Sequence, residues 1–190
     1  MSENAKNELL ELLDDLGCSK DCVAFQPTLI SSGFHHSTVT VQFPDGRTIQ
    51  GTGRGQRSPN ADIAAAQSVL DQLHANHRDL LIDWDKIKVE AQAGDALIKL
   101  SVYLSSDLKN ADDRSKRLQK LESDSHLATV FDQWKVQGDS DLVMWGTELG
   151  EKRKATLVEA ILWRRFRTQI ITTDVSVKLQ SLLKLLSEEA

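Results

Sequence analysis

The fold is decided by two stretches, EAQAGDALIKL at residues 90–100 and KATLVEAILW at residues 154–163. In each stretch one carboxylate, Asp95 or Glu159, is embedded among apolar and small residues. The apolar residues recur at helical spacing, so both stretches are predicted to form helices. Because a carboxylate is costly to remove from water without a positive partner, two such helices facing each other indicate a shared cation.

The spacing also predicts which side chains share a face of each helix. Asp95 lies beside the apolar stripe of the first helix, and Thr156 shares a face with Glu159 and Trp163 in the second. The apolar stripe of the first helix is predicted to consist of Ala93, Ala96, Leu97, Leu100 and Leu104.

The motif GDAL at residues 94–97, with the apolar helix that follows it, resembles the signature helix of the ribonuclease III family. ATLVEAI at residues 155–161 resembles the second acidic motif of that family. Between them, SDSHLA at residues 123–128 is similar to the start of the family's connecting helix. Three motifs in the expected order cover roughly residues 80–190. The resemblance implies an all-α ribonuclease III-like domain over 80–190 that hydrolyses phosphodiester bonds in RNA.

Two positions depart from the common family pattern. Ala91 stands where the pattern has a glutamate, and Thr156 stands where it has an aspartate. Both substitutions resemble the Mini-III branch, whose members keep two of the four carboxylates and are described as nucleases. The resemblance thus implies that Asp95 and Glu159 hold Mg²⁺ or Mn²⁺ and that Thr156 orients a ligand water. It also implies a homodimer in which the signature helix packs on its twofold mate.

The first 75 residues have a different pattern. A leucine repeat predicts a helix over 4–16, and the turn Pro-Asp-Gly-Arg at 44–47 predicts a hairpin. The helix is followed by three predicted strands, at 23–30, 37–43 and 48–53, and by a second helix that starts at Ser58. Val39, Val41 and Phe43 alternate along the second strand and are predicted to share one face. This α-β-β-β-α unit resembles the double-stranded RNA-binding domain, so the chain as a whole is predicted to be of the α+β class.

The resemblance implies three RNA-contacting surfaces in this domain. Glu11 falls at the minor-groove position of the first helix, and His36 falls in the loop after the first strand. The lysine cluster that would meet phosphates is absent from residues 58–62, and Arg54 and Arg57 offer a reduced substitute.

Charge indicates how strongly this domain binds RNA. Residues 1–75 contain five basic and nine acidic residues, a net charge of −4. Since phosphate neutralisation supplies most nonspecific affinity for nucleic acids, we expect weak RNA binding. The alternative is a domain kept for packing or for protein contacts.

The basic residues near Glu159 also have two interpretations. They form either a rim that tracks RNA phosphates around a catalytic cleft or the solvated faces of a helix. These residues are Lys152, Arg153, Lys154, Arg164, Arg165 and Arg167.

Composition sets the cellular context. The 190 residues contain no apolar run long enough for a membrane span and no predicted signal peptide, so we expect a cytoplasmic protein. Cys18 and Cys22 are expected to be free thiols, although with His35 and His36 they could also form a zinc site of unusual spacing. A last apolar stripe predicts a helix over 174–187.

Two classes of function follow. The first is a metal-dependent endoribonuclease that acts on double-stranded or structured RNA in RNA processing. The second is a catalytically inactive ribonuclease III-like protein that binds RNA or serves as a ribosome-associated scaffold.

Overall fold

The computed structural model describes residues 5–30, 33–105 and 110–170. These residues contain one three-stranded antiparallel sheet and six α-helices, which confirms the mixed α+β class. The predicted helix at 174–187 lies outside the described residues. The chain divides into two compact units. The first unit consists of the described residues up to Trp84 together with residues 129–153. The sequence analysis assigned residues 129–153 to the helical domain instead.

The sheet of the first unit consists of β1 (Val23–Leu29), β2 (His35–Gln42) and β3 (Thr48–Gly55), in the order β1-β2-β3. Strict alternation along β2 buries Val39 and Val41, and Phe43 is buried just beyond its end. The hairpin turn forms as predicted, because Gly46 supplies the φ of +88° that other residues rarely adopt.

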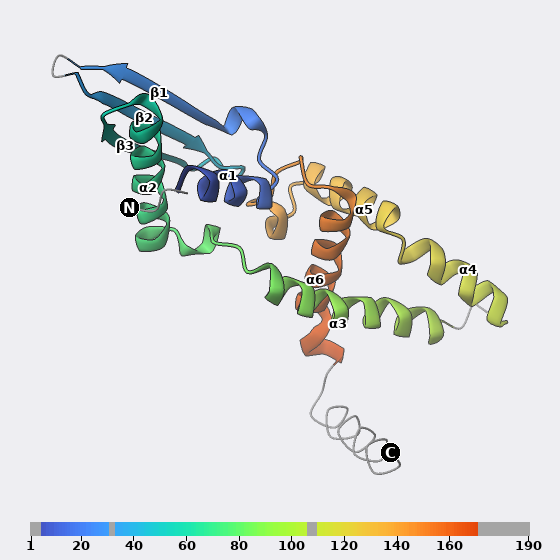
Figure 1. Ribbon diagram of the computed structural model, residues 1–190. Helices are drawn as coiled ribbons and strands as arrows, with labels where there is room; N and C mark the ends of the chain where they lie inside the picture. The colour runs from blue at the N-terminus through green and yellow to red at the C-terminus, as the bar shows by residue number, and fades with distance from the viewer. Residues whose placement is uncertain (1–4, 31–32, 106–109, 171–190) are drawn as a thin grey trace, which may run out of the picture. The chain divides into compact units, whose positions relative to one another are not determined.

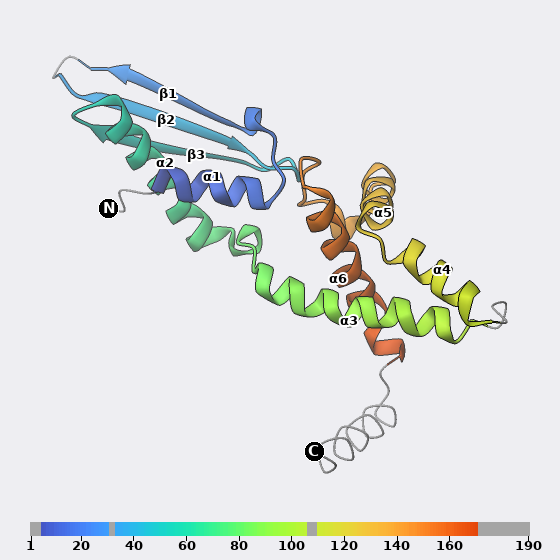
Figure 2. The same cartoon turned by 45° about the vertical axis from the view of Figure 1, so that its right-hand side comes forward.

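Two helices, α1 (Ala5–Asp15) and α2 (Ser58–Asn76), lie on the same face of this sheet (Figures 1 and 2). The helix α2 approaches β3 closely because Gly51 and Gly53 have no side chain; a Cβ on either would collide with the backbone of Ala65. Leucines and valines from both helices fill the core beneath the sheet, among them Leu9, Leu13, Leu16, Val69, Leu70 and Leu73.

β2 starts earlier and β3 ends later than the sequence analysis predicted. β2 begins at His35, so His36 lies within a strand, and the prediction that it lies in the preceding loop was wrong. β3 runs to Gly55 and therefore includes Arg54, which is the cross-strand neighbour of His36. The longer ladder places these two side chains together at one end of the sheet.

The second unit contains α4 (Ala111–Leu121), most of α3 (Trp84–Tyr103) and of α6 (Glu151–Ile170), and the start of α5 (Asp124–Val136). In the described part of residues 84–170 there is no strand, as predicted. None of the helices that the structure describes combines the length and apolarity needed to cross a bilayer.

The packed face of α3 differs from the predicted apolar stripe. Ala91 and Gly94 are buried, whereas Leu100 and Leu104 are 45% and 74% exposed. The reason is that α6 approaches α3 at Gly94, where the absence of a side chain allows backbone contact. The small residues therefore face α6, and the larger apolar residues are left exposed.

Candidate functional site

The two predicted catalytic carboxylates are brought together by a helix contact within the second unit. A Cβ on Gly94 would collide with the backbone carbonyl of Glu159, so α3 and α6 touch at these residues. Asp95 follows Gly94 directly, and its charge acts on the Glu159 carboxyl. The Gly-Asp sequence thus has a physical role, since the glycine permits the contact that places the aspartate beside the glutamate.

Glu159 lies in an environment that disfavours its ionised form. Its pKa is raised to about 7, mainly because burial removes the carboxylate from water. The neighbouring charges of Asp95 and Asp124 raise it further, and the ammonium group of Lys99 partly offsets them. Strongly perturbed carboxyl groups are enriched at functional sites, which makes Glu159 a candidate on physical grounds.

Lys99 is a resident cation of this site that the sequence analysis missed. Its Nζ donates to Asp95 Oδ2 at 2.6 Å and lies 3.9 Å from Glu122 Oε2. The hydrogen bond to Asp95 raises the pKa of Lys99, so the amine stays protonated. The four-residue spacing between Asp95 and Lys99 is the signal that could have revealed this pair from the sequence.

Two further carboxylates act on Glu159. Asp124 lies in the first turn of α5, and Glu122 occupies the C-cap position of α4. Among the described residues, no group of three or more acidic, histidine or cysteine side chains is arranged to hold a metal ion. Mg²⁺ needs less than such a cage, because one or two carboxylates with waters and substrate phosphates can hold it. The pair Asp95 and Glu159 fits that requirement.

The neighbouring predicted residues have distinct surroundings. Thr156 is half-buried on α6, one turn before Glu159. Glu90, one residue from the position of the missing family glutamate, accepts a hydrogen bond from Arg164 Nε at 2.7 Å. The charge of Arg164 is therefore paired with Glu90 within the protein.

The predicted RNA-binding residues of the first unit lie on its surface. Glu11 is exposed on α1, and Arg54 and Arg57 are exposed at the end of β3 and just before α2. His36 is half-buried in β2, with Arg54 and Thr28 as its cross-strand neighbours.

Asp62 occupies part of the region where the related domains carry lysines. Its side chain accepts hydrogen bonds from Ser37 Oγ at 2.6 Å and from Lys6 Nζ at 2.9 Å. Asp62 is 8% exposed, and Lys6 also lies over the ring of Phe25. This network joins α1, α2 and the sheet, so its polar groups stabilise the fold and are already paired.

The three basic residues at the start of α6 are not equivalent. Arg153 donates to carboxylates of Asp14 at 3.0 Å and Asp15 at 2.7 Å, and lies over the ring of Trp84. These contacts link Arg153 to α1, and its contact with RNA stays a prediction. Lys152 is exposed and Lys154 is half-buried.

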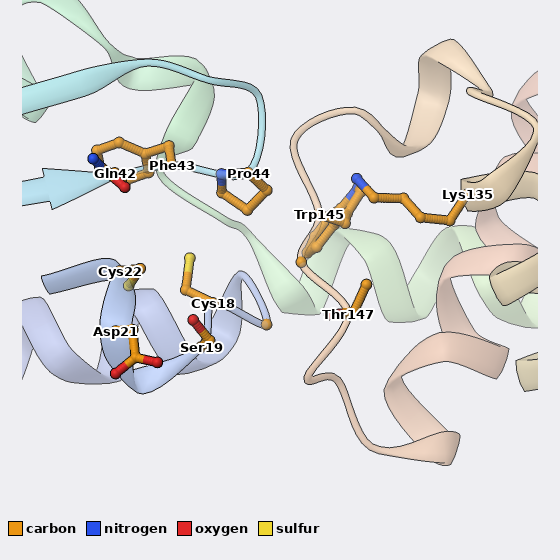
Figure 3. Close-up of a pocket in the computed structure, with 12 residues that line it drawn as sticks. Cys18, Ser19, Asp21, Cys22, Gln42, Phe43, Pro44, Lys135, Trp145 and Thr147 are labelled. Carbon is orange, nitrogen blue, oxygen red and sulfur yellow. The ribbon is translucent and has the colours of Figure 1, made fainter.

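A separate pocket of about 410 Å³ lies in the first unit (Figure 3). Cys18 and Cys22 lie on one side of it, and Lys135 and Trp145 lie on the other. Burial raises the pKa of the Cys18 thiol to about 12, which keeps the sulfur protonated and unsuited to metal binding. Because no described residues form a metal-binding group, the zinc interpretation has no support in the geometry.

Comparison of the chain with protein-family models, with curated proteins and with solved structures finds no match in any of the three. The relation to ribonuclease III therefore stays a prediction from the three sequence motifs.

Proposed function

We propose that this protein is a metal-dependent endoribonuclease that cleaves double-stranded or structured RNA. The observation that carries the proposal is the excess of negative charge around Glu159. Asp95, Glu122 and Asp124 all raise the pKa of Glu159, and Lys99 is the cation that offsets them. An excess of negative charge around a half-buried carboxyl group favours the binding of a divalent cation.

Asp95 and Glu159 are the residues that would hold the metal. Mg²⁺ bound there would supply a water of lowered pKa and neutralise charge on the attacked phosphate. Thr156, about one turn from Glu159 on α6, would orient a water with its hydroxyl group. Because α3 and α6 touch at Gly94, both carboxylates project from rigid helices, which fixes their separation before substrate arrives.

RNA would be held by exposed basic residues outside this pair. On α6, Lys152 is exposed and Lys154 is half-buried. In the first unit, Arg54 and Arg57 are exposed. These few basic residues neutralise few phosphates, so the proposed RNA affinity is low. We therefore propose a substrate long enough to contact several of them at once.

We also propose that the protein is a homodimer. Leu97, Ile98, Leu162 and Phe166 line an apolar groove of about 250 Å³ between α3 and α6. Leu104 on α3 is 74% exposed. Apolar surface of this kind on a single helix pair is typical of an interface, and a second copy would cover it. If so, Leu104→Ser lowers the mass measured by sedimentation from dimer to monomer, whereas an unchanged mass contradicts the dimer.

The nuclease proposal is tested with the purified full chain and long double-stranded RNA in Mg²⁺, Mn²⁺ or EDTA. We expect cleavage with either metal and none in EDTA. Glu159→Gln and Asp95→Asn should each lose more activity than the roughly 10–100-fold typical of losing an outer-shell partner, because each removes a ligand charge. The control is Asp85→Asn, an exposed aspartate on the same helix as Asp95. Equal cleavage by all four proteins contradicts the proposal.

One observation favours the second candidate, a catalytically inactive RNA-binding or ribosome-associated scaffold. The ion pair between Lys99 and Asp95 places a cation on one of the two proposed ligands without any metal. In an inactive protein this pair would stabilise the helix contact and the acidic cluster would be structural. Folded protein that binds RNA but leaves it intact in every metal would support this candidate.

A further inference from the structure

Lys99 differs from Lys88, a second lysine of the same helix that forms an ion pair. Lys88 pairs with Asp85 at 3.1 Å, and their side chains are 62% and 93% exposed. Lys99 pairs with Asp95 at 2.6 Å, and their side chains are only 45% and 31% exposed. The shorter and less solvated pair is the one that lies among additional carboxylates.

Lys99 interacts electrostatically with more than one carboxylate. Its Nζ lies 3.9 Å from Glu122 Oε2, an atom that is buried and, within the described residues, has no hydrogen-bond partner. Its charge also acts on Glu159. A buried carboxylate oxygen without a donor is costly unless a positive charge is close to it. Lys99 supplies that charge to the acids of three helical segments.

We propose that Lys99 is a built-in cation that takes the place of one divalent ion in an acidic cluster in which Asp95 and Glu159 are the proposed ligands and Glu122 is a neighbouring charge. It neutralises the cluster when no metal is bound, and it restricts the site to a single, weakly held divalent cation. This inference rests on the proposed metal-dependent function, because it assigns the residue that sets the metal affinity of the same site.

The physical reason is the competition between two cations for Asp95. An ammonium group at 2.6 Å occupies a lone pair of Asp95 Oδ2 and repels an incoming Mg²⁺ or Mn²⁺. Replacing Lys99 by methionine keeps the apolar stem and removes the charge. The cluster then has no internal cation, so its affinity for a divalent ion should rise.

The test measures Mn²⁺ binding to the full chain by electron paramagnetic resonance, with Mn²⁺ alone as the probe. Lys99→Met should bind Mn²⁺ about tenfold or more tightly than the unaltered protein, which corresponds to about 1.4 kcal/mol. Lys88→Met is the matched control, since it removes a paired lysine from the same helix away from the cluster. Adding Glu159→Gln to Lys99→Met should abolish the gain, which locates the ion.

A second readout uses stability in place of binding. Without metal, Lys99→Met should unfold at a lower temperature than the unaltered protein, because the carboxylates lose their cation. Mg²⁺ should restore its unfolding temperature, and Lys88→Met should show no such recovery. Lys99→Gln serves as the second variant if Lys99→Met does not fold, and the same recovery is expected of it.

The outcomes separate this inference from the proposed function. Mn²⁺ binding that is equal in the unaltered protein, Lys99→Met and Lys88→Met overturns the role of Lys99 and leaves the nuclease proposal standing. Binding by Lys99→Met but not by the unaltered protein supports the role of Lys99 and contradicts metal-dependent cleavage. Binding by none of the three proteins overturns both.

Discussion

Glu159→Gln should stabilise the metal-free protein at alkaline pH, although it removes a charged group from the proposed metal site. The pKa of Glu159 is raised from an ordinary value of about 4.5 to about 7, first by burial and then by Asp95 and Asp124. One pKa unit corresponds to about 1.4 kcal/mol, so the whole shift would amount to about 3 kcal/mol. Because Glu159 is only half-buried, solvent screening reduces the expected effect to about 1 kcal/mol.

The direction follows from proton binding. Between pH 4.5 and pH 7 the folded protein holds a proton on Glu159 that the unfolded chain has released. The contribution of Glu159 to stability is therefore fully present below pH 4.5 and is lost as the pH rises through 7. Glutamine cannot ionise, so the variant does not show this loss.

The assay is urea unfolding of both proteins in EDTA at a series of pH values from 4 to 8. The variant should match the unaltered protein at pH 4 and exceed its free energy of unfolding by about 1 kcal/mol at pH 8. Asp85→Asn, which changes an exposed aspartate, should show no such trend. A variant that is equally stable at every pH, or less stable at pH 8, would refute the reasoning from burial and neighbouring charge.

Three other predictions follow from the packing and the charges. Gly94→Ala should lower the free energy of unfolding by about 2 kcal/mol or more, because the added methyl group would collide with the α6 backbone. Gly150→Ala, at a position with open space around it, is the control, and equal unfolding temperatures for the two variants would contradict the helix contact. Arg153→Met should lower stability by about 1 kcal/mol, measured by thermal unfolding, and should leave RNA affinity unchanged, because this arginine is paired with α1. A loss of RNA affinity without destabilisation would contradict this expectation. The affinity of the full chain for double-stranded RNA should fall with salt along a slope no steeper than roughly −4 in a logarithmic plot, because the four basic residues proposed to meet phosphates contribute about −0.9 each. A steeper slope would show that more phosphates are neutralised.

The parts of the fold that depend on local pattern were predictable. The alternation of Val39, Val41 and Phe43 predicted the buried face of β2, and Pro44-Asp45-Gly46-Arg47 predicted the hairpin. These features are decided by residues close together in the sequence, where period and turn chemistry are sufficient.

Features that depend on contacts between distant residues were not predictable. Helical spacing identified apolar residues on α3 but could not show that α6 would pack on Ala91 and Gly94, leaving Leu100 exposed. The pairing of Arg153 with Asp14 joins residues far apart in the chain. A basic run near an acidic motif gives no indication of which of its charges the fold itself neutralises.

The candidate site was predictable in part. The motifs located Asp95 and Glu159, and in the structure the charge of Asp95 raises the pKa of Glu159. The role of Lys99 was not predicted, because the analysis of residues 90–100 considered only the apolar stripe and the single aspartate of this helix. Glu122 was missed because its approach depends on where α4 ends.

The most direct test of the account is a crystal structure of the protein soaked in Mn²⁺, with the metal located by its anomalous scattering. We predict one Mn²⁺ peak at inner-sphere distance, about 2.1 Å, from a carboxylate oxygen of Asp95 or Glu159, with Lys99 moved off Asp95 Oδ2. The account is contradicted if Lys99 still pairs with Asp95 and no Mn²⁺ peak lies beside either carboxylate.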